Sequence, residues 1–229
     1  MQSPHRITKP AFRPSVMGRN GMVTSGHPLA SQAGIQTLMA GGNAVDAAIA
    51  TAAALGVVEP GASGVGGDGF MLIYLADSES VEAVNATGAA PKAATREIYL
   101  KDGGIPMKGI RSTSIPGLVD GWLISHQKHG KLPLGKVFEP ATSLCENGFP
   151  VNYKLSHGLR RERERFATDP FTRAIFTNDG KALGPGDLLF QRNLGVTLQK
   201  IADEGRSTFY EGEIAEAIVA FSETRDGLL

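Results

Sequence analysis

The chain has 229 residues, enough for one or two domains with a sizeable hydrophobic core. Its 23 Lys and Arg residues balance its 23 Asp and Glu residues, so the formal net charge is zero, which argues against a general nucleic-acid-binding or membrane-surface protein. No stretch approaches the roughly 18 uninterrupted apolar residues that a membrane span needs.

Residues 1–20 form an expected irregular lead-in, rich in Pro and Arg. They contain no apolar core of the kind found in a secretory signal, so we expect a cytoplasmic protein. Residues 21–24 are predicted to begin a short strand. Pro28 suits the first turn of a helix that runs to about Ala40, where Gly41 and Gly42 end it.

The most informative stretch is a helix of small residues that leads into a glycine-rich loop. Asn43 can cap the helix, expected over 44–58, and Pro60 can stop it. Because no side of this helix is broadly polar, we expect most of its surface to be buried. The loop has Gly at positions 61, 64, 66, 67 and 69. Phosphate-binding loops need a strand before the glycines and a helix after them, so the opposite order here excludes nucleotide binding.

Two strands, 70–76 and 81–86, are predicted to pair around a turn near 77–80. The first strand is apolar without clear alternation, and we therefore expect it to be covered on both faces. A short helix near 94–100 follows, and a longer one is expected from 115 to 129.

The second half of the chain is predicted to be helical apart from turns at 176–189. Helices are expected at 134–147, 155–167, 192–204 and 209–221. The charged run at 160–165 alternates in sign and indicates a solvated helix face. The predicted strands lie early in the chain and most of the later elements are helices, an order that suits part of a layered α/β fold.

Several residues with chemical potential have plain structural interpretations. Cys145, the single cysteine, is interpreted as a small buried residue rather than a nucleophile. His126 and His129 lie three apart, but nothing completes a metal-ligand set, so no metal and no cofactor is predicted. Asp68, within the glycine run, either caps a turn or faces a substrate.

Five segments follow one another in a characteristic order. They are GMVTSGHPLASQAGIQTLMAGGNAVDAA at 21–48, NATGAAPKAATREIYL at 85–100, STSIPGLVDGW at 112–122, KLPLGKVFEPATSLCENGFPV at 131–151 and GPGDLLFQRNLGVTLQKIADEGRSTFYEGEIAEAIV at 184–219. In this order they resemble the gamma-glutamyltransferase (gamma-glutamyltranspeptidase) family, and the resemblance covers nearly the whole chain after about residue 20.

The resemblance implies an α+β fold: a helix-rich, partial N-terminal nucleophile hydrolase αββα sandwich, with residues 21–229 as an incomplete large subunit. In that family a precursor cuts itself, and the newly exposed N-terminal Thr attacks an amide with its own amine as base. That Thr is expected downstream of this chain, so the resemblance assigns no catalytic residue here. It implies two partners, a small-molecule amide substrate and a small subunit from the same precursor, and the chain alone is expected to be inactive.

The substrate expectation depends on Thr87 and Gly88, the two residues that the resemblance places at a substrate-binding position. Many family members have Arg followed by Glu there, and that Arg holds the substrate α-carboxylate through a two-point pairing. Thr87 cannot replace it, which favours relatives that act on other amides, such as oxamate amidohydrolases or acylases. Arg96 or Arg111 could compensate. A conventional glutathione hydrolase and a non-catalytic scaffold therefore remain as alternatives.

Overall fold

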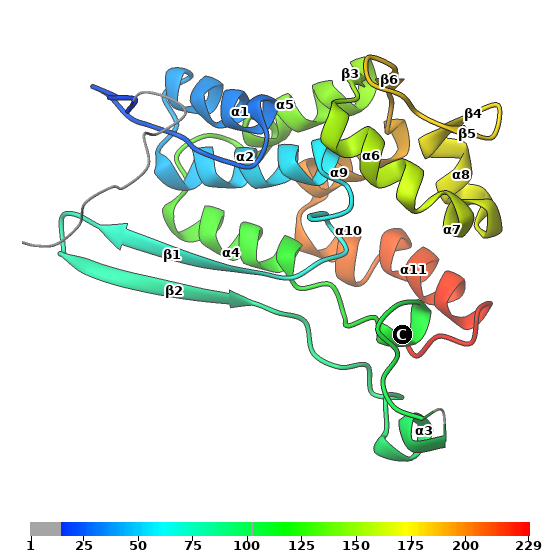
Figure 1. Cartoon of the computed structure of the whole chain (residues 1–229). Helices are drawn as coiled ribbons and strands as arrows, with labels where there is room; N and C mark the ends of the chain where they lie inside the picture. Colours follow the sequence, from blue (N-terminus) through cyan, green and yellow to red (C-terminus); the bar gives the residue numbers. More distant parts are fainter. Residues whose placement is uncertain (1–14, 102) are drawn as a thin grey trace, which may run out of the picture.

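The computed structural model describes residues 15–101 and 103–229 (Figure 1). Most of the expected lead-in lies outside the described residues, and its remainder, 15–20, contains neither helix nor strand. Residues 21–24 are also irregular, so the strand predicted there is wrong. A strand needs a neighbour, and this segment instead packs against the first helix, where Val23 lies close to Gly34.

Two helices of small residues, α1 (Pro28–Met39) and α2 (Ala44–Val58), pack closely against each other. At Gly34 of α1, an added Cβ would lie 3.1 Å from the Ala47 carbonyl oxygen of α2, so glycine permits this approach. Eleven of the fifteen residues of α2 are buried, which confirms the prediction of a buried helix. Both predicted helix ranges are confirmed.

The N-terminus of α1 is capped by an unusual residue, His27. Its Nδ1 accepts a hydrogen bond from the Leu29 backbone N–H at 3.2 Å, which requires that nitrogen to be unprotonated. Burial lowers the pKa of His27, a shift that nearby Lys154 reinforces and Glu59 opposes. The cap is therefore a property of the neutral imidazole.

We expect the free energy of unfolding to fall as the pH drops below about 6.5, the usual pKa of a His in an unfolded chain. His27 binds a proton less well in the folded protein than in the unfolded chain. The free energy of unfolding therefore continues to fall until the pH has passed the lowered pKa of His27 in the folded state. Urea unfolding of the protein at pH 7.5 and pH 5.5 measures it. His27→Asn keeps a capping oxygen without a titrating ring and should show a smaller difference between the two pH values. An equal difference in both proteins would contradict this role of His27.

The main core lies between these helices and three more, α4 (Leu118–His129), α5 (Leu134–Asn147) and α9 (Arg192–Glu204). Trp122 of α4 and Phe138 of α5 meet edge to face, with their ring centroids 5.9 Å apart. Cys145 of α5 is fully buried, and burial raises the pKa of its thiol to about 12. This confirms its interpretation as a packing residue, because the thiolate is the reactive form.

A long antiparallel hairpin of β1 (Gly69–Leu75) and β2 (Ser80–Ala86) extends below the helices and confirms the two predicted strands (Figure 1). One of its faces packs on α4. On the other face Phe70, Leu72 and Tyr74 are 77%, 76% and 64% exposed. The expectation that β1 is covered on both faces is therefore wrong for this chain, because α4 is the only layer against it in the part that the structure describes.

The remaining elements are short. They are α3 (Arg96–Lys101), η1 (Ile110–Ser112), β3 (Phe149–Pro150), α6 (Tyr153–Arg161), α7 (Arg163–Thr168), α8 (Pro170–Phe176), β4 (Thr177–Asn178), β5 (Lys181–Ala182), β6 (Leu188–Leu189), α10 (Arg206–Tyr210) and α11 (Glu213–Glu223).

Three predicted helices differ from the structure. The helix expected from 115 to 129 begins only at Leu118. The helix expected at 155–167 is two helices, which meet at Glu162, and its expected exposure is only partly correct because Leu159 is 5% exposed. The helix expected at 209–221 begins only at Glu213, after the separate α10.

Within the described residues, every helix is too short or too polar to cross a membrane. The cytoplasmic location stays a prediction, as does the boundary at residue 20.

Candidate functional site

Three segments that are distant in sequence meet where the hairpin ends and α4 begins. They are residues 64–69, 85–90 and 113–118, and we call their meeting point the glycine junction. The Gly67 carbonyl oxygen accepts the N–H groups of Gly117 at 3.1 Å and Leu118 at 2.9 Å. The Ile115 N–H donates to the Ala89 carbonyl oxygen at 3.0 Å. The glycine-rich loop thus joins the start of α4 to the segment after β2.

The junction depends on backbone contacts that exclude side chains. A Cβ added at Gly88 would fall on the carbonyl oxygen of Ile115. A Cβ at Gly117 would lie 2.7 Å from the Gly88 nitrogen. Neither glycine has a positive φ, so close approach rather than backbone conformation requires glycine at these positions.

Asp68 links all three segments. Its Oδ1 accepts the Gly88 N–H at 2.7 Å, and its Oδ2 accepts the Ser114 hydroxyl at 3.1 Å. The side chain is nevertheless exposed. Asp68 therefore connects segments 20 and 46 residues away rather than capping its own turn, and it keeps its carboxylate in contact with solvent. Its role in facing a substrate stays a prediction.

Thr87 and Gly88, the predicted substrate-binding residues, both lie on the junction. The Thr87 hydroxyl donates to Asn85 Oδ1 at 2.6 Å, and the Thr87 N–H donates to the same oxygen at 3.0 Å. The side chain of Thr87 is exposed and held in one orientation by Asn85. Gly88 contributes backbone only, and Asp68 already occupies its N–H. Their role in substrate binding stays a prediction.

The two arginines considered as substitutes lie outside the three segments of the junction. Arg111 is half-buried, and its Nε donates to the main-chain oxygen of Asp226 at 3.1 Å. Arg96 begins the exposed helix α3, which Figure 1 shows below the end of the hairpin. A compensating role for either residue stays a prediction.

Sequence reasoning missed Tyr210, which supports the junction from α10. Its hydroxyl donates to the Pro116 carbonyl oxygen at 2.8 Å and accepts the Asp120 N–H at 3.0 Å. Burial raises the pKa of Tyr210, so the hydroxyl stays protonated at neutral pH. Nothing in the local sequence signals this role, because both partners lie at least 90 residues away.

An apolar pocket of about 450 Å³ adjoins the junction on the side of Tyr210. Lys92 supplies its one charged side chain among the lining residues that the structure describes. The walls are formed mainly by Pro91, Ile115, Pro116, Phe209, Ile218 and Val219. The pocket can accept an apolar group next to the exposed Thr87 segment.

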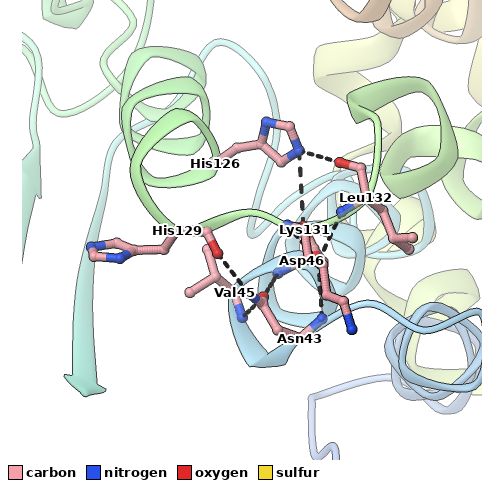
Figure 2. Close-up of polar contacts among 7 residues, drawn as sticks. All are labelled: Asn43, Val45, Asp46, His126, His129, Lys131 and Leu132. Atoms are coloured by element: carbon pink, nitrogen blue, oxygen red, sulfur yellow. Dashed lines mark hydrogen bonds and ion pairs between the residues drawn. The ribbon is translucent and has the colours of Figure 1, made fainter. Parts of the chain in front are cut away.

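A buried carboxylate holds α2 against the connection between α4 and α5 (Figure 2). Asp46 is completely buried, and its oxygens accept the backbone N–H groups of Asn43 at 2.9 Å, Lys131 at 3.1 Å and Leu132 at 3.3 Å. The Asn43 amide donates to the His129 carbonyl oxygen at 2.5 Å. This arrangement is structural, since main-chain donors satisfy the charge.

The two histidines of α4 take part in the same region without forming a metal site. His126 Nε2 lies 2.7 Å from the Leu132 carbonyl oxygen and 3.8 Å from Asp46 Oδ1. His129 Nε2 instead lies 2.9 Å from Glu82 Oε2 on the hairpin. In residues 15–101 and 103–229, no group of three or more His, Cys, Asp or Glu side chains is arranged to hold a metal ion.

Comparison with known proteins agrees with the architecture. A family model described as gamma-glutamyltranspeptidase matches residues 30–229. The "Glutathione hydrolase-like YwrD proenzyme" of Bacillus subtilis is 43% identical over 207 residues, which are 90% of this chain and 39% of that protein. A crystal structure of Helicobacter pylori gamma-glutamyltranspeptidase superposes with a TM-score of 0.89 at 34% identity, over 94% of this chain and 63% of that one.

One acylase is equally similar in structure. Cephalosporin acylase from Bacillus halodurans matches with a TM-score of 0.89 and 34% identity, over all of this chain and 44% of that one. The chain spans about two fifths of the length of the curated relatives that it matches.

The fold is thus that of part of an N-terminal nucleophile hydrolase, the class that carries out amide hydrolysis and acyl transfer on an αββα sandwich. Within this class, the chain belongs to the gamma-glutamyltranspeptidase family.

Proposed function

We propose that this chain is the large-subunit part of an enzyme that cleaves or transfers the acyl group of a small-molecule amide. The nucleophilic Thr and the small subunit come from a further segment of the same precursor. The observation that carries the proposal is the family match across residues 30–229, combined with coverage of only 39% of a relative named as a proenzyme. No described residue is assigned as the nucleophile.

The uncovered face of the hairpin supports a second layer. Phe70, Leu72 and Tyr74 form a row of large apolar side chains exposed by 64% or more. A contiguous apolar face of this kind marks an interaction surface. The small subunit would cover it and thereby complete the sandwich.

The acyl group is proposed to be something other than γ-glutamyl. Thr87 offers one hydroxyl, already held by Asn85, and no charge for a substrate α-carboxylate. An acylase or another amidohydrolase fits this site better. A conventional glutathione hydrolase is the second candidate, and Lys92 on the adjoining pocket is the observation that favours it, because Lys92 supplies a cation.

The test uses the product of the full reading frame. We expect the precursor to cut itself into two subunits, visible on a denaturing gel, and the processed protein to hydrolyse small acyl p-nitroanilides faster than γ-glutamyl p-nitroanilide. The 229-residue chain alone should show no hydrolysis. Activity of that chain alone would contradict the placement of the nucleophile, and a preference for the γ-glutamyl substrate would establish the second candidate.

A further inference from the structure

The glycine junction carries a fixed negative charge in contact with solvent. Asp68 is exposed, yet its two oxygens are held by the Gly88 N–H at 2.7 Å and by the Ser114 hydroxyl at 3.1 Å. Both donors are neutral, so the charge is oriented but not neutralised. Asp68 forms no ion pair with the residues that the structure describes.

This charge lies next to the predicted substrate-binding residues. The Gly88 nitrogen, 2.7 Å from Asp68 Oδ1, is the peptide nitrogen that follows Thr87, so this carboxylate oxygen lies within about 4 Å of the Thr87 carbonyl carbon by ordinary peptide geometry. Burial is the main cause of the raised pKa of Tyr210, whose hydroxyl contacts the Pro116 carbonyl oxygen of the junction, and the charge of Asp68 adds a smaller contribution in the same direction.

The other charged groups around the junction do not cancel it. Arg206 is paired with Asp120 at 2.7 Å and with Glu211 at 3.2 Å. Lys92 lines the adjoining apolar pocket and is the one cation available to a ligand there in the described part of the chain. A ligand that reaches Thr87 thus comes close to an oriented carboxylate that pairs with no cation of the described residues.

We infer that Asp68 determines substrate specificity by charge, and that it selects amides with an uncharged acyl group over amides whose acyl group carries a carboxylate. This inference rests on the proposed amidohydrolase function and deepens it. Like charges about 5 Å apart in a partly solvated site change relative affinity on the order of tenfold. The apolar pocket then receives the uncharged group.

The experiment uses the full-length, processed protein with glutaryl and glutaramoyl p-nitroanilides, which differ only in a carboxylate against a carboxamide. Asp68→Asn preserves the geometry, because its amide oxygen can accept the Gly88 N–H and its NH₂ can donate to the Ser114 oxygen. We expect kcat/KM for glutaryl relative to glutaramoyl anilide to rise about tenfold, mainly through KM. Asp77→Asn, an exposed carboxylate at the opposite end of the hairpin, should leave the ratio unchanged.

Two further variants distinguish the effect of the Asp68 charge from the effect of the hydrogen bonds that position it. Asp68→Ala breaks both hydrogen bonds and should lower hydrolysis of both substrates together. Lys92→Met should leave the ratio at or below its wild-type value. If the protein hydrolyses glutaramoyl anilide but Asp68→Asn leaves the ratio unchanged, the inference is wrong while the proposed function stands. If the processed protein hydrolyses no amide, both are wrong.

Discussion

Replacing Gly88 with alanine is expected to disrupt the glycine junction more than adding a methyl group at any other residue of the junction. The new Cβ would fall on the Ile115 carbonyl oxygen, and this contact is between two backbone segments rather than with a flexible side chain. Relief requires the segment after β2 to move away from the start of α4. We expect the free energy of unfolding to fall by about 3 kcal/mol or more, and amide hydrolysis by the full-length protein to fall with it.

Urea unfolding and steady-state kinetics measure the two effects. Gly66→Ala is the matched control, because it lies in another segment of the same junction and an added Cβ there would have no atom within 4 Å. It should unfold within about 1 kcal/mol of the wild-type protein. Similar stabilities for the two variants would show that the contact between Gly88 and Ile115 is absent in solution.

The same contact restricts how specificity could be changed. Family members with Arg and Glu at the positions of Thr87 and Gly88 need room for a Cβ at the second position, which this backbone does not provide. We therefore expect Thr87→Arg alone to give little selectivity for γ-glutamyl substrates. The new guanidinium would extend from a backbone segment whose path differs from that in family members with Arg and Glu at these positions.

Removing the buried carboxylate of Asp46 is the second change with a large expected effect. Asp46→Ala would leave the N–H groups of Asn43, Lys131 and Leu132, which are at least partly buried in these contacts, without their acceptor. Buried donors without partners cost about 1 to 3 kcal/mol each before relaxation. We expect the free energy of unfolding to fall by about 3 to 5 kcal/mol.

Thermal and urea unfolding check this expectation. Asp46→Asn keeps one acceptor oxygen and should lose less than Asp46→Ala, so it remains measurable if the alanine variant fails to fold. Asp77→Ala, which removes an exposed carboxylate, should unfold within about 0.5 kcal/mol of the wild-type protein. Equal losses for Asp46→Ala and Asp77→Ala would refute the structural role of Asp46.

Local signals in the sequence predicted the longer helices well. Asn43 caps α2 as expected, and Gly130 ends α4. The failures have non-local causes. The segment at 21–24 has strand-like residues, but none of the described strands pairs with it. The exposed face of β1 could not be foreseen from its apolar sequence, because exposure depends on which layers are present.

The candidate site was predictable only in part. Resemblance directed attention to Thr87 and Gly88, and both lie on the junction. The hydrogen bond from Ser114 to Asp68 spans 46 residues, and the one from Tyr210 to Pro116 spans 94. Contacts at such separations leave no periodicity or spacing in the sequence, so only the folded structure relates these residues to the site.

The uncovered row of Phe70, Leu72 and Tyr74 has a practical consequence for handling this polypeptide. Sheets with an exposed apolar face tend to associate with one another. The isolated chain should therefore self-associate as its concentration rises. Replacing these three residues with threonine should suppress this self-association without unfolding the helices, because their side chains point away from α4. Under the proposed function, the same substitutions should weaken the association of this chain with the small subunit.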